Sequence, residues 1–271
     1  MDPGCKGLEK WKDILHRKYL GDLILGNQKE IIFGIRAVTE AIQSGQELEK
    51  IFFRTDLRGE QSSELMNLSR KAGIPSQFVP IEKLNRYTRK NHQGVVALIS
   101  PILYHDMEKL VPMVYESGRV PLIMVLDGIT DVRNFGAIAR TAECAGVDGL
   151  IIPHKGAARI HEDAVKTSAG ALLSIPVCRH HNLVEAVRYL KNSGIRAVGA
   201  TEKSKLTFYE TSFMDPVAII MGSEEKGISG ALLKMCDELV SIPLFGNISS
   251  LNVSVAASLL MYEAIRQRTQ N

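Results

Sequence analysis

From Leu122 onwards, the sequence alternates short apolar runs with longer segments that have helical spacing of their apolar residues. The runs are rich in Val, Ile and Leu. This alternation predicts a series of strand–helix units, which build a mostly parallel sheet covered by helices on both faces. Because such sheets bind ligands at the carboxyl ends of their strands, the loops that follow the apolar runs are the first candidates for a site.

The expected strands and helices of this second domain, residues 121–271, follow from the same pattern. The strands are Leu122–Leu126, Leu150–Ile152, Ile175–Arg179, Arg196–Ala200, Val217–Met221 and Leu239–Leu244. The helices are Asn134–Ala145, Glu162–Leu172, Leu183–Asn192, Gly230–Asp237 and Val253–Arg266.

The N-terminal part predicts a smaller α/β domain at residues 31–100. Residues 1–30 are expected to be a loosely attached extension. The proline-containing stretch 101–120 is expected to be a linker between the domains, with an amphipathic piece from Asp106 to Glu116. The expected elements of the small domain are helix Ala37–Ser44, strand Lys50–Thr55, helix Ser62–Ala72, strand Gln77–Val79, helix Ile81–Tyr87 and strand Val95–Ile99.

Charge is almost balanced over the chain, with a formal net charge of +3, and the excess of basic residues lies in residues 1–120. The segment from Arg86 to Gln93 contains Arg86, Arg89, Lys90 and His92 and has the composition of a phosphate-binding loop. These four residues are therefore candidates for contact with RNA. A solvated surface explains the basic excess equally well.

Two loops of the second domain have residues suited to holding a ligand. The first contains Gly222 and Gly227, which allow a ligand to approach the main chain. The second ends at Asn252, which is placed at the start of the last helix. Two ordinary strand-to-helix turns would give the same composition. A nucleotide-binding phosphate loop is excluded, because Ile228 stands where that motif requires Lys.

Cysteine and histidine spacing gives no sign of a disulfide framework or a metal site. The four cysteines have no C-x-x-C spacing, no apolar run has the length of a membrane span, and His161-Glu162 is not followed by a second His at metalloprotease spacing. We therefore expect a cytoplasmic protein without a metal or a membrane contact.

Three motifs then resemble the signature of a known family. They are LDGITDVRNFGAIARTAECAG with Asn134 and Arg140, IIMGSEEKGIS with Glu224, and IPLFGNISSLNVSVAASLLMYE with Asn252. In this order they resemble the three motifs of the SpoU (TrmH) family of RNA ribose 2′-O-methyltransferases. The first domain, with its FGIRAV opening and NHQGVVALI close, is similar to the RNA-binding extension of that family. The resemblance points to the RlmB-like branch, which methylates a guanosine ribose in 23S rRNA.

The resemblance implies a fold and a cofactor that periodicity alone does not show. The fold is the SPOUT-type α/β class, in which the last segment passes through a loop to form a deep trefoil knot. S-adenosylmethionine, without a metal, would be the methyl donor and would bind in the knotted turns. The family also implies a homodimer, with the C-terminal helix in the interface and the active site completed across it. The residues implied to hold the cofactor are Thr201, Met221, Gly222, Ile242, Leu244 and Leu251.

The resemblance also implies the catalytic roles. Arg140 would act on the ribose hydroxyl; because arginine is effectively always protonated, we expect it to orient the hydroxyl and the adjacent phosphate, and its action as the base itself stays open. Asn134 would hydrogen-bond near the reacting hydroxyl or orient Arg140, Glu224 would fix Arg140 or the ribose, and Asn252 would hold the loop that positions the methyl donor.

The function that these motifs predict is methyl transfer to a ribose 2′-hydroxyl of RNA, with a guanosine of 23S rRNA or of a large-subunit precursor as the target. Two alternatives stay open. One is the same chemistry on tRNA or on an rRNA adenosine. The other is an RNA-binding protein that keeps the knot without turnover.

Overall fold

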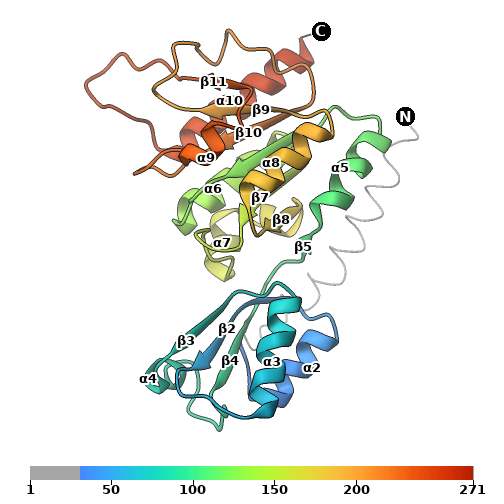
Figure 1. Ribbon diagram of the computed structural model, residues 1–271. Coiled ribbons are helices and arrows are strands. Elements are labelled where there is room, and N and C mark those ends of the chain that lie inside the picture. Colours follow the sequence, from blue (N-terminus) through green and yellow to red (C-terminus); the bar gives the residue numbers. More distant parts are fainter. Residues whose placement is uncertain (1–30, 271) are drawn as a thin grey trace. The chain divides into compact units, whose positions relative to one another are not determined.

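The computed structural model of this chain describes residues 31–270. They divide into two compact units that meet in the sequence between Leu103 and Tyr104, and each unit is described by itself (Figure 1). The extension expected at residues 1–30 lies outside the described residues.

The N-terminal unit contains a four-stranded mixed sheet with the order β1-β4-β2-β3. Strand β4 is antiparallel to both β1 and β2, whereas β2 and β3 are parallel. The strands are β1 (Ile31–Phe33), β2 (Leu48–Arg54), β3 (Ser76–Val79) and β4 (Val95–Ile99).

Apolar side chains along β2 alternate between the two faces of this sheet, and both faces are packed. Ile51 and Phe53 lie in one core, which the helices α2 (Ile35–Gln43) and α3 (Glu60–Lys71) cover. Phe52 lies on the other face, beside the short helix α4 (Ile81–Asn85). Period-two alternation of buried residues is the pattern of a strand that is covered on both sides. The small N-terminal α/β domain predicted from the sequence is confirmed.

The interval 101–120 does not have the structure expected of a linker. It contains β5 (Tyr104–His105), which pairs with the second sheet, and α5 (Met107–Glu116). The helix buries Leu110 and Val114 in the core of the second unit. The amphipathic piece expected from Asp106 to Glu116 corresponds to α5, and burial of its apolar face outweighs the local cost of Pro112 within the helix.

The second unit is built on a seven-stranded sheet with the order β11-β9-β10-β6-β7-β8-β5, and all of its neighbouring strands are parallel. This confirms the predicted parallel sheet. Besides β5, its strands are β6 (Leu122–Leu126), β7 (Gly149–Pro153), β8 (Val177–His180), β9 (Arg196–Ala200), β10 (Val217–Met221) and β11 (Glu238–Val240).

Helices cover both faces of this sheet. On one face, α5 and α8 (Leu183–Asn192) share a core with α9 (Gly230–Leu233). On the other face, α6 (Val132–Cys144) packs against both α7 (Glu162–Thr167) and α10 (Val253–Thr269), and α10 reaches β10. The trefoil knot that the family resemblance implies stays a prediction.

Three expected elements of the second domain end well before their predicted C-terminal residues. The helix expected to run to Leu172 ends at Thr167, because Ala169 and Gly170 have positive φ angles of 51° and 86°, and a separate 3₁₀ turn follows. Helix α9 ends at Leu233. Strand β11 ends at Val240, so the apolar residues beyond it belong to a loop.

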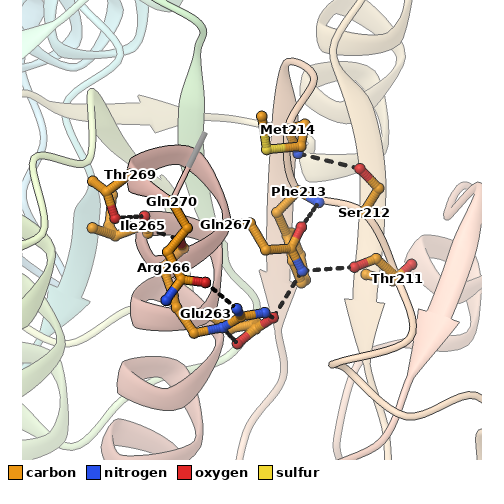
Figure 2. Close-up of polar contacts among 10 residues, drawn as sticks. All are labelled: Thr211, Ser212, Phe213, Met214, Glu263, Ile265, Arg266, Gln267, Thr269 and Gln270. Atoms are coloured by element: carbon orange, nitrogen blue, oxygen red, sulfur yellow. Dashed lines mark hydrogen bonds and ion pairs between the residues drawn. The ribbon is translucent and has the colours of Figure 1, made fainter.

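The C-terminal end of α10 is held to the loop before β10 by side-chain hydrogen bonds. Figure 2 shows Gln267 between this loop and Glu263. The Gln267 amide donates to the Thr211 carbonyl over 2.9 Å and to Glu263 Oε1 over 2.8 Å, and its Oε1 accepts from the Phe213 N–H over 2.7 Å. Arg266 pairs with both oxygens of Glu263 at 2.8 and 2.7 Å.

Arg268 adds a second connection at the same end of the helix. Its guanidinium donates to the carbonyls of Phe213, Val120, Pro121 and Asp215, over 2.7 to 3.1 Å. These carbonyls lie immediately before β6 and β10, two neighbouring central strands. The last turn of α10 is therefore fixed to the amino edge of the sheet.

Candidate active site

The carboxyl ends of β6, β10, β9 and β11 lie next to one another, because these strands are consecutive in the sheet. Asp127, directly after β6, connects two of their loops. Its backbone N–H donates to the Met221 carbonyl over 2.8 Å, and its carboxylate accepts from the Ser229 N–H over 2.8 Å. The loops after β6 and β10 thus form one structure at the edge where parallel sheets bind ligands.

Three of the four predicted catalytic residues meet at this edge. The Asn134 amide donates to Glu224 Oε1 over 3.1 Å, and the Asn252 amide donates to Asn134 Oδ1 over 2.9 Å and to Glu224 Oε1 over 2.8 Å. The backbone N–H of Val253 also donates to Glu224 Oε1, over 3.2 Å. One carboxylate oxygen therefore accepts three hydrogen bonds, and the side chains form a closed triangle.

The N-terminal ends of two helices position two of the three residues in the triangle. Asp131 caps α6 by accepting the Asn134 N–H over 2.8 Å, which places Asn134 in the first turn. Asn252 is itself the N-cap of α10 and accepts the Ser254 N–H over 2.9 Å. The predicted position of Asn252 at a helix start is confirmed. Because its Oδ1 is used in capping, its amide nitrogen is directed to Asn134 and Glu224.

Arg140 lies apart from the triangle. It is exposed on α6, six residues after Asn134 and therefore roughly 120° around the helix from it. Among the described residues it makes no hydrogen bond or ion pair with the three others. Its neighbour Thr141 contacts Ser258 of α10, with the two hydroxyl oxygens 3.2 Å apart. Arg140 therefore lies beside the face of α6 that meets α10.

Gly222, at the end of β10, lies in a loop with no room for a side chain. A Cβ atom there would lie 2.0 Å from the carbonyl carbon of Gly227 and 2.1 Å from the nitrogen of Ile228. The loop closes through hydrogen bonds in both directions between Ser223 and Gly227. Only glycine allows this close approach of two backbone segments, which shapes a turn able to cradle a ligand.

The other residues predicted to hold the cofactor follow three neighbouring strands. Thr201 comes directly after β9, and its N–H donates to the Val240 carbonyl over 2.9 Å. Met221 is buried at the end of β10. Ile242 and Leu244 lie in the loop after β11, and Leu251 comes just before α10. Leu244 and Leu251 keep 38% and 37% of their surface exposed. A backbone cradle with exposed leucines fits a ligand that has an apolar, planar part.

Neither a metal site nor a membrane span is found in the described part of the chain. No group of three or more His, Cys, Asp and Glu side chains in residues 31–270 is arranged to hold a metal ion. Among these residues, no helix combines the length and the hydropathy needed to cross a bilayer.

The predicted RNA-binding residues of the small unit divide into two groups. Arg86, Arg89 and Lys90 are exposed at and after the end of α4, as a contact with RNA requires. His92 is buried: its Nδ1 accepts the Gly94 N–H over 3.0 Å, and its Nε2 lies 3.0 Å from Asn85 Oδ1. Because both ring nitrogens organise the loop, the structure does not support a direct RNA contact for His92.

A groove of about 570 Å³ lies between α2 and α3 of the same unit, away from these residues. None of the four predicted RNA-binding residues lines it. Its walls carry both signs of charge, with Arg36 and Glu40 on α2 and with Glu64 and Lys71 on α3. The groove therefore gives no preference for a polyanion.

Sequence reasoning missed two residues that build the active site. Asp127 and Asp131 were given no role, yet one connects two loops and the other caps α6. A signal was present, because Asp directly after a buried strand and Asp just before a helix are both typical of structured turns.

With this geometry in place, comparison with known proteins defines the class of protein. Residues 121–262 match the SpoU rRNA methylase family, and residues 31–105 match the RNA 2′-O ribose methyltransferase substrate-binding domain. The chain belongs to the SpoU/TrmH family of RNA methyltransferases.

Curated relatives match over nearly their whole length. A Staphylococcus saprophyticus protein assigned to the TrmH family of tRNA/rRNA methyltransferases is 37% identical over 238 residues, which covers 88% of this chain and 96% of the relative. The Bacillus subtilis protein YacO, assigned to the same family, is 34% identical over 244 residues, with 90% and 98% covered.

Solved structures of SpoU enzymes have the same architecture. The methyltransferase AviRb from Streptomyces viridochromogenes, in complex with AdoMet, is 26% identical with a TM-score of 0.57, covering 92% of this chain and 97% of AviRb. The TrmH/SpoU tRNA modifying enzyme of A. aeolicus is 29% identical with a TM-score of 0.52, covering 60% of this chain and 85% of that enzyme.

Proposed function

We propose that this protein transfers a methyl group from S-adenosylmethionine to a ribose 2′-hydroxyl of RNA. The observation that carries the proposal is the hydrogen-bonded triangle of Asn134, Glu224 and Asn252 at the carboxyl edge of the sheet. It joins one residue from each of the three family motifs beside the glycine cradle at Gly222.

The chain's own residues have two tasks in this reaction. S-adenosylmethionine supplies a methyl group activated by a sulfonium. The protein must hold a ribose hydroxyl in line with that methyl group and help to remove the hydroxyl proton. Glu224 holds Asn134 and Asn252 in fixed orientations, so that the N-terminal ends of α6 and α10 stay aligned. Thr201, Gly222, Ile242, Leu244 and Leu251 would surround the methyl donor on the neighbouring loops.

Arg140 is the group that orients the hydroxyl and the adjacent RNA phosphate in this proposal. Within one chain it lies away from the triangle, so we place it in the site of a second copy. Helix α10, which α6 packs against, has an exposed apolar stripe of Val255, Leu259 and Tyr262, with 48%, 39% and 50% of their surface exposed. These residues are spaced along one face of the helix. A homodimer formed through this stripe brings Arg140 to the interface.

The substrate that we propose is a guanosine in 23S rRNA or in a large-subunit precursor. Support comes from the substrate-binding domain at residues 31–105 and from the exposed Arg86, Arg89 and Lys90 on it. The same chemistry on tRNA is the second candidate, because the curated relatives are assigned to tRNA and rRNA together and the A. aeolicus enzyme modifies tRNA.

The test is transfer of labelled methyl from S-adenosylmethionine to total RNA of a strain that lacks this protein, followed by mapping of the methylated ribose. Label at one guanosine of large-subunit rRNA supports the proposal, and label in tRNA supports the second candidate. No label on free RNA or on ribosomal particles contradicts both.

Two variants test the arrangement of the site. Arg140→Ala is expected to reduce transfer by about 10²- to 10⁴-fold and to leave cofactor binding unchanged, because the residue acts on the hydroxyl. Arg188→Ala, an exposed arginine on α8, is the matched control. Mixing Arg140→Ala with Glu224→Ala subunits should restore part of the activity if the site is shared between copies. No restoration in verified mixed dimers contradicts the shared site.

A further inference from the structure

The carboxyl edge of the sheet continues beyond the triangle, to the ends of β7 and β8. The loop 154–161 follows β7 and is joined to both neighbouring loops. The Ala158 N–H donates to the Ile129 carbonyl over 2.7 Å, and the His154 N–H donates to the His180 carbonyl over 3.1 Å. This loop therefore connects the segment that leads to Asn134 with the end of β8.

Two histidines stack at the far end of this loop. The rings of His154 and His181 have centroids 3.9 Å apart and are 6° from parallel. Burial, together with the positive charges of His181, Arg179 and His180, lowers the pKa of His154 to about 4. His154 is therefore neutral near neutral pH, and its ring supports His181 without charge repulsion. His181 stays exposed although one face of its ring is covered.

Basic side chains accompany the stack. Lys155 and Arg159 are exposed in the loop 154–161, which contains no acidic residue. At the end of β8, the guanidinium of Arg179 lies 3.8 Å from the ring centre of Tyr104. Acidic residues are present on the adjoining helices, with Glu162 and Asp163 in the first turn of α7. Positive charge is thus concentrated in the loop itself.

We propose that the loop 154–161 and His181 form a binding site for single-stranded RNA that flanks the methylated nucleotide. In this site an unpaired base stacks on the open face of His181, and Lys155 contacts a backbone phosphate. Stacking platforms combined with basic side chains are how proteins hold single strands without reading their sequence. The inference rests on the proposed function, since it adds a contact for the same RNA substrate.

The position of the site favours RNA over a protein partner. The hydrogen bond between Ala158 and Ile129 places this loop next to the segment that enters α6 at Asn134. A strand whose ribose lies at the triangle can therefore continue along the same edge towards His181. The loop 154–161 exposes basic side chains and a glycine rather than large apolar side chains, which are typical of the centre of a protein interface.

The test uses the full chain and a fluorescent single-stranded RNA of about twelve nucleotides, a length within the range of single-strand sites. Binding is measured at several salt concentrations. His181→Ala is expected to weaken binding by about tenfold, whereas His181→Phe keeps a stacking surface and should retain most of the affinity. Lys155→Ala is expected to reduce the slope of log K against log salt by about 0.7, the value for one phosphate contact on a single strand.

The control is Lys234→Ala, an exposed lysine at the C-terminal end of α9, close to the opposite edge of the sheet. It should leave affinity and salt slope unchanged. Equal affinities for wild type, His181→Ala and Lys155→Ala would overturn the proposal, as would equal effects of Lys155→Ala and Lys234→Ala. Measurement by circular dichroism shows whether each variant is folded.

The methyl-transfer assay separates this inference from the proposed function. If wild type transfers methyl to RNA, His181→Ala should raise KM about tenfold with little change in kcat, because it removes a contact made equally in the ground and transition states. If wild type transfers no methyl, the proposed function fails, while the binding comparison still decides whether RNA uses this site. A fall in kcat without a change in KM would contradict the site.

Discussion

The two ends of helix α10 differ in what their polar residues do. At the N-terminal end, Asn252 is exposed and shares Glu224 with Asn134 in the hydrogen-bonded triangle. At the C-terminal end, Gln267 and Arg268 donate to backbone carbonyls of the segments that precede β6 and β10. The first set is accessible to a substrate, and the second fixes the chain to itself.

This difference indicates a division of labour along one helix. The C-terminal end determines where the helix lies on the sheet, and the N-terminal end presents Asn252 at the site. Substitutions at the two ends should therefore separate activity from stability. The following predictions test that separation, from the largest expected effect to the smallest.

Among the substitutions that compare the two ends of α10, Glu224→Ala should cause the largest change, and in activity alone. One oxygen of Glu224 accepts three hydrogen bonds, so its removal releases both asparagines of the triangle. Loss of such positioning is expected to lower methyl transfer about 10²-fold. Because Glu224 is exposed, the free energy of unfolding should change little. Transfer kinetics and urea unfolding measure the two effects, and a large loss of stability with normal transfer would reverse the assignment.

Arg268→Ala should act mainly on stability. The substitution leaves the carbonyls of Phe213, Val120 and Asp215 without the guanidinium that they share. We expect a loss of about 2–4 kcal/mol in the free energy of unfolding. In a domain of this size that corresponds to a decrease in Tm of roughly 5–15 °C. Arg188→Ala, which removes an exposed arginine on α8, is the control. Equal changes in Tm for the two variants would show that the hydrogen bonds of Arg268 do not stabilise the fold.

Two substitutions of Asn252 distinguish its capping role from its role in the triangle. Asn252→Ser keeps a side chain that caps α10 but lacks the amide that donates to Glu224, so stability should be nearly unchanged while transfer decreases about tenfold. Asn252→Ala should also lose about 1 kcal/mol of stability, because it removes the cap. Calorimetry and transfer assays on both variants test this, and full activity of Asn252→Ser would mean that capping is its only role.

The smallest effect concerns acid pH at the C-terminal end. Hydrogen bonds from Arg266, and then from Gln267, hold the pKa of Glu263 below its ordinary value of 4.5. The unfolded chain therefore binds a proton more readily, and the stability contributed by Glu263 is present above pH 4.5 and is lost as pH falls through its folded pKa. In urea unfolding at acid pH, Glu263→Gln should show a shallower loss of stability than wild type. Identical pH dependence would contradict this.

The sequence predicted the N-terminal end of α10 far better than the C-terminal end. Asn252 stands at the boundary between a loop and a periodic apolar segment, which is a local signal that capping chemistry explains. Arg268 has no such signal, since its partners are carbonyls that are 53 to 148 residues away. A backbone carbonyl is present at every position, and therefore sequence does not indicate which ones an arginine will contact.

The strands show the same distinction. Val217–Met221 and Leu122–Leu126 were predicted with their observed bounds, because central parallel strands are buried on both faces and are apolar throughout. The interval 101–120 was predicted to be a linker that contains an amphipathic piece, so α5 was indicated while the edge strand β5 and the place of both elements in the second unit were not. Their assignment to the second sheet depends on a pairing with β8 more than 70 residues further along the chain.

The predicted site residues also show the difference between local sequence signals and tertiary packing. His92 was predicted to contact RNA because it follows basic residues, but burial and two ring contacts give it a structural role. Arg140 was grouped with Asn134 by motif, whereas helical geometry directs the two side chains to different sides of α6. Local sequence identifies which residue types are present, but direction and burial depend on the packing around them.

The sequence by itself determined the α/β class, the order of most strands and helices along the chain, and the residues of the three motifs. These follow from periodicity, turn chemistry and motif spacing, which act over a few residues. Only the tertiary structure decided the order of strands in the sheet, the meeting of Asn134, Glu224 and Asn252, and the stacking of His154 on His181. Each of these requires chain segments that are distant in the sequence, and their pairing is set by burial of the whole core rather than by local pattern.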